Sequence, residues 1–525
     1  MTQSAGDATQ HEELSGRKRR ILLITLLLGA MVTMLNTAVA GVAIPTIAAD
    51  LKASGIQIHL IGDGFAIALT SLVLLTGAIG DRYGRRRNLL TGLALMIPSA
   101  IMASRSTTPS ELILWLMASG AAAAFLFPTT LSAISEMYPD AQERSRAVGL
   151  WAGCAAAGAA LAPVLSGLIL EHFYWGYVFL VSVPVAAITL ILGFLVMPQM
   201  KHAGAPPVDW IGGIFSIIGI GGLLLLVIFG PVEGWHEPVP LFAAAAVLGL
   251  GAFIARQLTA TYPLLDLRVF KHKPLTGGSL IIMILFAAMA GIMYLNAQFT
   301  QMVLGFSTLN AGLAVLPLSA SVFIGAPLSA NLVRRIGARN TVMLGAVLAA
   351  CGSAIVFFWT DHSPYPVLFV TFVLLGLGIG FGMTPSTSAI LDTLPPKQAG
   401  IASAVNDVTR DFGQSMGIAI MGSLASVTYA KVLASGYESL SPEQQAQIPK
   451  DIAIQIQSSL AGAIAVADAY PGSNADQLLA AAREAFVAGL GRAGALSTGL
   501  ALLCLVIAFL MIPHTLSRNR GEDQA

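Results

Sequence analysis

The feature that most constrains this chain is a series of apolar stretches, each of roughly 20 residues, recurring from residue 21 to residue 512. A stretch of that length crosses the hydrocarbon core of a bilayer as an α-helix about 30 Å long. Backbone polar groups find no water inside lipid, so each stretch is predicted to be helical. Only 10% of the 525 residues are charged, too few to give a soluble protein of this length a polar surface. The sequence therefore predicts an all-α membrane protein.

Fourteen stretches qualify as membrane spans. They cover approximately residues 21–43, 59–80, 88–104, 111–136, 145–170, 177–197, 211–230, 239–258, 276–301, 311–333, 340–360, 366–391, 400–428 and 493–512. With the N-terminus inside, 21 of the 28 Lys and Arg residues fall in cytoplasmic segments, six fall outside and Arg410 lies within a span. We therefore expect a multi-pass protein of the inner (cytoplasmic) membrane with both termini in the cytoplasm and no cleaved signal.

A weak internal repeat divides the chain into two halves. An R-x-G-x-R turn follows span 2 at residues 82–86 and span 10 at residues 335–339. Spans 4 and 12 share a proline followed by an acidic residue: Pro128 and Glu136, Pro385 and Asp392. Two six-helix bundles explain both matches, and spans 7 and 8 are then an inserted hairpin.

The predicted organisation follows from this repeat. It consists of an N-terminal tail (1–20), an N-terminal bundle (21–200), the hairpin (201–262), a C-terminal bundle (263–513) and a C-terminal tail (514–525). The one long extramembrane loop, 429–492, contains helix-like stretches at 452–468 and 474–491. These predict a helical hairpin lying on the outer surface, with a disordered loop as the alternative.

Ionisable side chains inside the spans are the candidate functional residues, because a charge in lipid costs about 3 kcal/mol unless it is paired or hydrated. Asp63, about one turn into span 2, is a candidate cation contact or proton site; an aspartate that caps the helix is the alternative. Span 13 places Asp407, Arg410 and Asp411 at i, i+3 and i+4, so the two carboxylates share one face about 6 Å apart along the axis.

Two carboxylates in a poorly hydrated cavity cannot both stay charged cheaply, so we expect at least one to exchange protons near neutral pH. The alternative is a structural ion pair between Asp407 and Arg410, which leaves Asp411 to act alone. Polar and aromatic residues are candidate cavity liners for flat lipophilic cations, although most aromatics in spans simply face lipid or core. They are Asn36, Asn296, Gln298, Phe65, Phe127, Tyr294, Phe299 and Phe412.

Three motifs occur in order along the chain. GAIGDRYGRRR spans residues 77–87, Gly158, Pro163 and Gly167 lie in span 5, and LGFSTLNAGLAVLP spans residues 304–317. Together they make the chain resemble the fourteen-span drug:proton antiporters of the major facilitator superfamily, and the QacA-like and EmrB-like members in particular. In those members Asp63 and Asp411 match acidic positions, and Asp407 matches the second of an adjacent acidic pair whose first position is Asn406 here.

The resemblance implies a major facilitator fold of two six-helix bundles plus two extra helices. It implies a monomer that exports amphipathic, cationic small molecules in exchange for protons, conferring drug resistance, in contact with membrane lipid, with no nucleic-acid partner. The proton gradient supplies the energy, and no cofactor or metal is expected. It further implies that six residues of the first motif gate the cytoplasmic side, the alternative being a basic loop that only sets topology: Gly77, Asp81, Arg82, Gly84, Arg85 and Arg86.

The same resemblance implies that Gly158, Pro163 and Gly167 form the antiporter motif and let span 5 pack closely and bend. Two departures stand out. Asn36 replaces an aspartate of span 1, and Leu116 replaces the arginine of an R-x-x-Q-G motif in span 4. They leave open a second function, export of one specific metabolite or antibiotic with altered or weak proton coupling. The sequence has no P-loop or H-E-x-x-H string, so an enzyme is not expected.

Overall fold

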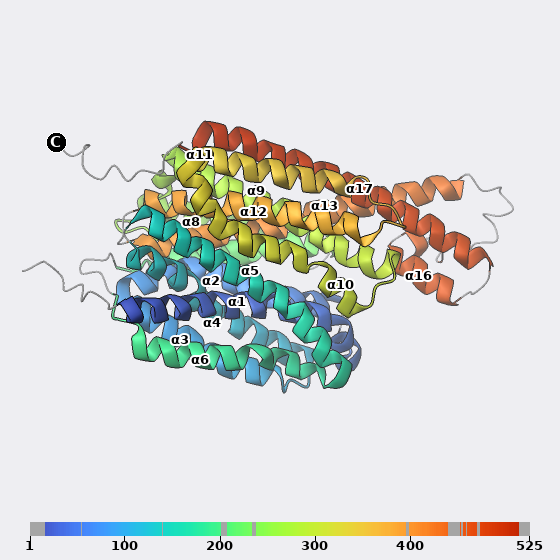
Figure 1. The fold of residues 1–525 in the computed structure, drawn as a ribbon. Coiled ribbons are helices and arrows are strands. Elements are labelled where there is room, and N and C mark those ends of the chain that lie inside the picture. The colour runs from blue at the N-terminus through green and yellow to red at the C-terminus, as the bar shows by residue number, and fades with distance from the viewer. Residues whose placement is uncertain are drawn as a thin grey trace, which may run out of the picture.

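The computed structural model describes residues 16–53, 55–138, 140–200, 207–233, 238–394, 398–438, 452, 455–457, 459–469 and 473–513. Throughout these residues the regular elements are helices, as the apolar stretches predicted (Figure 1). In chain order they are α1 (Gly16–Leu51), α2 (Gly55–Tyr83), α3 (Arg85–Ala103), α4 (Pro109–Met137), α5 (Ala141–His172), η1 (Trp175–Val181), α6 (Ser182–Val196), α7 (Trp210–Glu233), α8 (Val239–Thr259), η2 (Leu267–Lys271), α9 (Lys273–Gln298), η3 (Phe299–Val303), α10 (Thr308–Ala314), α11 (Leu316–Val356), α12 (Tyr365–Thr393), α13 (Ala399–Glu438), α16 (Leu460–Ala469) and α17 (Ser473–Met511).

Fourteen membrane crossings fit these helices. Within the described residues, twelve helices are long and apolar enough to cross a membrane by length and composition. The helix α3, which begins with three arginines, is not among the twelve but is 19 residues long. The helix α11 counts once, although Gly337 has non-helical backbone angles (φ 84°, ψ 161°) that divide its 41 residues into two crossings. The predicted fold class is confirmed.

The two R-x-G-x-R turns each have a central glycine with a positive φ angle. Gly84 has φ of 106° and Gly337 has φ of 84°, and both values lie in the region that disfavours residues with a Cβ atom. Each glycine lets the chain leave one helix and begin the next within a single residue. The internal repeat is therefore visible in the backbone as well as in the sequence.

The helices form two bundles that lie side by side (Figure 1). One bundle contains α1–α6, and the other contains α9–α13 and α17. The hairpin of α7 and α8 packs against α2 and also touches α13, so it lies beside the junction of the bundles. The bundles meet along two helix pairs, α2 with α13 and α5 with α11, while α4 also reaches α13. Side chains on these helices are therefore shared between the halves.

The helices on either side of loop 429–492 continue past the membrane, which differs from the predicted surface hairpin. The predicted stretch 474–491 is the first half of α17, and α13 continues to Glu438; each helix has about 40 residues and is about 60 Å long. Apolar side chains of α13, α16 and α17, among them Leu433, Leu460 and Phe486, share one buried cluster. This packing stabilises helix within both predicted stretches, as α16 and as the first half of α17. Figure 1 shows these helices projecting from one end of the bundle.

Candidate functional site

Three ionisable side chains of α13 form one cluster, called here the α13 charge cluster: Asp407, Arg410 and Asp411. Arg410 donates from Nε and Nη2 to Oδ1 of Asp411, at 2.9 and 2.8 Å. Its Nη1 lies 3.6 Å from Oδ1 of Asp407. Helical spacing favoured Asp407 as the partner of Arg410, yet the hydrogen-bonded partner is the adjacent residue Asp411. The side chain of Arg410 is 4% exposed and that of Asp407 is fully buried.

The opposite half supplies two contacts to this cluster. Thr70 of α2 donates from Oγ1 to Oδ2 of Asp411 at 2.8 Å. The guanidinium carbon of Arg410 lies 4.6 Å from the ring centroid of Phe127 in α4. Phe127 was predicted as a candidate liner, and here it stacks on a cation of the chain itself. Thr70 was missed because a threonine in a membrane helix ordinarily bonds its own backbone and gives no sequence signal.

Further polar groups of the C-terminal half adjoin the cluster. Thr387 of α12 donates to Oδ1 of Asn406 at 2.9 Å, and Nδ2 of Asn406 donates to Oδ1 of Asp407 at 3.3 Å. The second carboxylate oxygen of Asp407, Oδ2, is buried and has no hydrogen-bond partner among the described residues. A buried oxygen without a partner has lost its water without compensation. That oxygen is therefore available to a further donor.

Asp63 lies apart from the α13 charge cluster. It is seven residues, or about 10 Å along α2, from Thr70, the residue that touches Asp411. The helix begins at Gly55, eight residues earlier, so Asp63 lies beyond the first two turns and does not cap the helix. Its side chain is partly exposed, and it has neither a hydrogen-bond nor an ion-pair partner among the described residues.

Asp81 joins the two halves at the other end of α2. Its carboxylate accepts from the backbone N–H of Gly400 at 2.9 Å and from that of Ile401 at 3.3 Å. These amides belong to the first turn of α13, where the helix dipole and free N–H groups favour an anion. Gly77 permits the approach, because a Cβ atom there would lie 2.7 Å from the carbonyl oxygen of Gly400. We call this arrangement the Asp81 contact.

Arg85 supports the Asp81 contact from within the N-terminal half. Its guanidinium lies 3.4 Å from Asp81, pairs with Glu136 and donates to the carbonyl of Ser132 at 2.9 Å. The positive φ of Gly84 starts α3 immediately after α2 and so sets Arg85 beside Asp81. The six predicted gating residues do not all lie together. Gly77, Asp81, Gly84 and Arg85 gather at this contact, whereas Arg86 donates to the carbonyl of Phe194 at 2.8 Å. Arg82 is partly exposed.

A second ion pair crosses between the halves at the same end of the bundle. Arg144 of α5 lies 2.7 Å from Asp392 of α12. The sequence held a signal for this pair, since Asp392 occupies the position in the second half that Glu136 occupies in the first. Matching the acids across the repeat identified their equivalence, but only the structure identifies their different arginine partners.

The three antiporter-motif residues of α5 face two neighbours. A Cβ atom on Gly158 would lie 2.3 Å from the carbonyl oxygen of Met31, so this glycine permits close packing on α1 within its own half. Pro163 and Gly167 face α10 of the other half, where their neighbours are Gly312 and Leu309. The motif therefore contributes both to the N-terminal bundle and to the junction.

The remaining candidate liners do not join the α13 charge cluster through any hydrogen bond among the described residues. Asn36 is buried between α1, α3 and α6: its Nδ2 donates to the carbonyl of Val32 at 2.9 Å, and its Oδ1 accepts from Ser182 at 3.1 Å. Asn36 thus lies inside the N-terminal half. Asn296 is buried, and its Oδ1 has no hydrogen-bond partner in the described part of the chain. Gln298 and Phe412 are partly exposed. For these three, lining a cavity stays a prediction.

The position of Leu116 predicts how the chain responds to the missing arginine of span 4. Leu116 is buried in an apolar cluster with Leu112, Ala162 and Phe179. Leu116→Arg would place an unpaired charge there, so we expect it to lower the free energy of unfolding by about 3 kcal/mol. Thermal unfolding of the purified protein in detergent measures this change, with Leu116→Met as the volume-matched control. Wild-type stability of Leu116→Arg would contradict the prediction.

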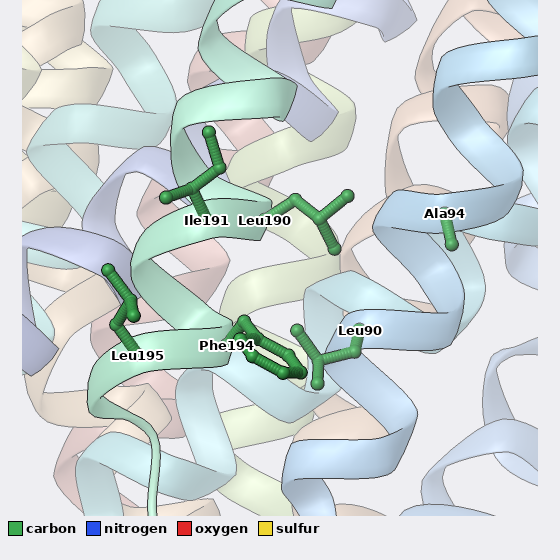
Figure 2. A pocket seen from close by; sticks show the side chains of 6 residues that line it. All are labelled: Leu90, Ala94, Leu190, Ile191, Phe194 and Leu195. Carbon is green, nitrogen blue, oxygen red and sulfur yellow. The ribbon is translucent and has the colours of Figure 1, made fainter.

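An apolar surface groove lies between α3 and α6 (Figure 2). Six side chains line it: Leu90, Ala94, Leu190, Ile191, Phe194 and Leu195. It offers no ionisable group, and Ile191, Phe194 and Leu195 are more than half exposed on the outside of the bundle. In a membrane this surface faces lipid, so the groove is separate from the α13 charge cluster.

Comparison with known proteins agrees with this architecture. Residues 26–418 match the family model of the Major Facilitator Superfamily. The chain is 30% identical over 491 residues to the multidrug efflux pump LfrA of Mycolicibacterium smegmatis, covering 93% of this chain and 95% of LfrA. It is 31% identical over 478 residues to the methyl viologen resistance protein SmvA of Salmonella typhimurium, covering 89% and 93%. It is 27% identical over 511 residues to the tetracenomycin C resistance and export protein of Streptomyces glaucescens, covering 95% and 93%.

Solved structures share the fold. The proton:xylose symporter XylE matches with a TM-score of 0.60 at 14% identity, covering 95% of this chain and 96% of XylE. An inward-facing bacterial homologue of the lysosomal transporter Spinster matches with a TM-score of 0.59 at 16% identity, covering 96% and 99%. The chain belongs to the major facilitator superfamily. It is a multi-pass membrane transporter rather than an enzyme, and its relatives are multidrug and antibiotic efflux pumps.

Proposed function

We propose that the chain exports amphipathic cations across the inner membrane in exchange for protons. The observation that carries the proposal is the α13 charge cluster, a carboxylate pair buried where α13 meets α2 and α4. Ionisable groups at such a place are costly and are retained where they bind cargo or protons. The proposed orientation puts the Asp81 contact and both termini on the cytoplasmic side, and the proposed working unit is a monomer.

The transport cycle that we propose uses Asp411 and Asp407 as alternate sites for cargo and proton. A proton entering from outside neutralises a carboxylate, weakens its attraction for the bound cation and so favours release. Loss of that proton toward the cytoplasm restores the charge and the affinity for the next cation. The Asp81 contact closes the cytoplasmic side in the present conformation, and it must break for cargo to enter.

The relatives support a cationic cargo. The relative SmvA, which aligns with 89% of this chain, is a methyl viologen resistance protein. Methyl viologen is a flat, doubly charged aromatic cation. Such a cation is suited to a site that combines carboxylates with aromatic rings.

Ethidium efflux tests the proposal. In energised cells that carry the chain, ethidium export is expected to exceed that of cells without it and to collapse when a protonophore dissipates the gradient. Cells that carry the Asp411→Asn variant, which is expected to be inactive, control for ethidium export by other pumps. Export that persists after the gradient has collapsed would contradict proton exchange.

A second proposed function is export of one specific compound with weak proton coupling, and two residues support it. Leu116 lies among apolar side chains and Asn36 is tied to neighbours within the N-terminal half, so neither contributes a charge to coupling. One relative is named for resistance to and export of a single compound, tetracenomycin C. If the chain exports one specific metabolite or antibiotic with weak coupling, a broad panel of cations will give no export, and its cargo will move without a proton gradient.

Asp63 is expected to distinguish cargo by charge. Its partly exposed carboxylate lacks a partner among the described residues and lies about 10 Å from Thr70, far enough to serve a second positive charge. Asp63→Asn should reduce methyl viologen export about tenfold, equivalent to about 1.4 kcal/mol, and change ethidium export far less. Initial rates in inverted vesicles measure both. An equal loss for the two cations would instead indicate a coupling or structural role for Asp63.

A further inference from the structure

The guanidinium of Arg410 occupies a cage made from both halves of the transporter. Asp411 accepts two of its hydrogen bonds, and Thr70 holds the other oxygen of that carboxylate at 2.8 Å. Phe127 covers one face of the guanidinium at 4.6 Å. The ring is itself fixed, because Phe127 is fully buried and lies 5.0 Å from the ring of Trp151, whose Nε1 donates to Thr130 at 2.9 Å.

This arrangement is not the one that local helix geometry favours. Adjacent residues on an α-helix point about 100° apart, so Arg410 and Asp411 do not face each other by position alone. Asp407, at i−3, is the partner that spacing favours, and its Oδ1 is 3.6 Å away. The arginine therefore leaves its natural helical partner for a carboxylate and a ring at the junction of the halves.

The cage has the chemistry that a flat organic cation requires. A carboxylate beside an aromatic face attracts a planar, weakly hydrated positive charge, and guanidinium is such a charge. Arg410 is also the basic residue that the sequence places deepest within a span, since Arg146 and Arg256 lie within two residues of their span ends. The position best suited to a cationic cargo is thus already filled by a cation attached to the chain.

We infer that Arg410 is a tethered competitor of the cargo, which leaves Asp411 and Phe127 for Asp407 when a cationic substrate binds. The inference rests on the proposed function for the nature of the cargo. Asp407 is a ready second site for the guanidinium, because Oδ2 of this buried carboxylate has no partner among the described residues. Two acids that flank one arginine then have separate tasks: one holds cargo, and the other receives the displaced arginine.

Binding of a monovalent cation neutralises the cluster, whose net charge goes from −1 to zero. With Arg410 on Asp411, the cluster holds one cation and two carboxylates; with cargo on Asp411 and Arg410 on Asp407, each carboxylate has its own cation. Neither state leaves both acids bare in a site of low dielectric, which would be costly. Return of Arg410 to Asp411 would also help to expel the cargo.

Equilibrium binding of ethidium to the purified full-length chain in lipid nanodiscs tests the inference. If Arg410 leaves the cage free in about one molecule in ten, removing it should tighten ethidium binding about tenfold. Arg410→Gln is therefore expected to bind more tightly than the wild type, and to export ethidium more slowly because release loses its competitor. Addition of Asp411→Asn to Arg410→Gln should abolish the gain.

Two further variants keep the test decisive. Arg410→Lys retains the charge, but an ammonium lies less favourably on a ring and is more strongly hydrated. It is expected to tighten ethidium binding about threefold, an intermediate gain, even if Arg410→Gln does not fold. Thr409→Val on the same helix leaves all charges in place and should bind like the wild type. Among the described residues, the Thr409 hydroxyl donates to the carbonyl of Val405 and to no other group.

The outcomes separate the inference from the proposed function. Unchanged or weaker binding by folded Arg410→Gln or Arg410→Lys, in a wild type that binds and exports ethidium, would overturn the competitor role alone. A wild type that neither binds nor exports ethidium or methyl viologen would overturn both.

Discussion

Replacement of Asp411 by asparagine is expected to abolish cation export. Asp411 accepts both hydrogen bonds of Arg410 and one from Thr70, so the change removes the charge that joins α13 to α2 and leaves Arg410 buried without its main partner. Loss of one partner of a buried ion pair costs about 3 kcal/mol or more in stability. Because the lost carboxylate is also the proposed cargo site, we expect an initial rate at least about a hundredfold lower, which corresponds to about 2.7 kcal/mol.

Initial rates of ethidium transport in inverted vesicles, normalised to the amount of inserted protein, measure this effect. Asp361→Asn is the matched control, because Asp361 is an exposed acid that pairs with the neighbouring residue His362 and is not part of α13. The control should transport like the wild type. If Asp411→Asn also kept the wild-type rate, the proton and cargo sites would have to lie elsewhere.

Replacement of Asp81 by asparagine is expected to open the arginine-rich end of the bundle. The carboxylate of Asp81 holds the amides of Gly400 and Ile401, and an asparagine would turn an N–H group or a weaker acceptor toward them. A charge-assisted hydrogen bond contributes about 2 kcal/mol, so loss of one of these two bonds should by itself shift the balance of states by about thirtyfold. Export should fall by at least about tenfold, because closure at that end becomes unfavourable.

Distances between spin labels at Arg146 and Arg335 report the shift. Both positions are exposed near that end of the bundle, one in each half, and the labels require a chain in which Cys154, Cys351 and Cys504 are replaced by alanine. Asp81→Asn should populate longer distances than the unsubstituted chain. Asp266→Asn is the control, because Asp266 accepts from the nearby N–H of Arg268 and, within the described residues, has no hydrogen bond or ion pair across the halves. Identical distance distributions in all three chains would rule out a gating role for Asp81.

Hydropathy predicted most of the fold because the constraint it reflects is local. Each apolar stretch must be a helix wherever it crosses lipid, whatever its neighbours are. Residues 474–491 are helical as predicted, but hydropathy did not show that they are continuous with the last span in α17, where apolar contacts with α13 and α16 stabilise them. It also placed the start of α2 one turn too late, and so set Asp63 too near the helix end.

Side-chain partners at the site were only partly predictable. Spacing along α13 identified Asp407, Arg410 and Asp411 as one group, and the glycine pattern marked Gly77 and Asp81 as an unusual turn. The partners that these residues contact across the halves could not be predicted. They are Thr70, Phe127 and the amides of Gly400 and Ile401, each more than 200 residues from its partner in the sequence. Such contacts depend on how the helices of the two bundles are aligned against each other. That alignment cannot be read from a single sequence.

The sequence by itself determined the membrane class, the fourteen crossings and which ionisable residues are immersed in them, since these follow from the transfer of each segment from water to lipid. Only the tertiary structure decided that Arg410 turns to Asp411 and Phe127 rather than to Asp407, and that Asp81 caps α13 of the other half. The reason is physical: burial in lipid is a property of a segment alone, whereas a buried charge takes the partner that the packing of distant helices brings within reach.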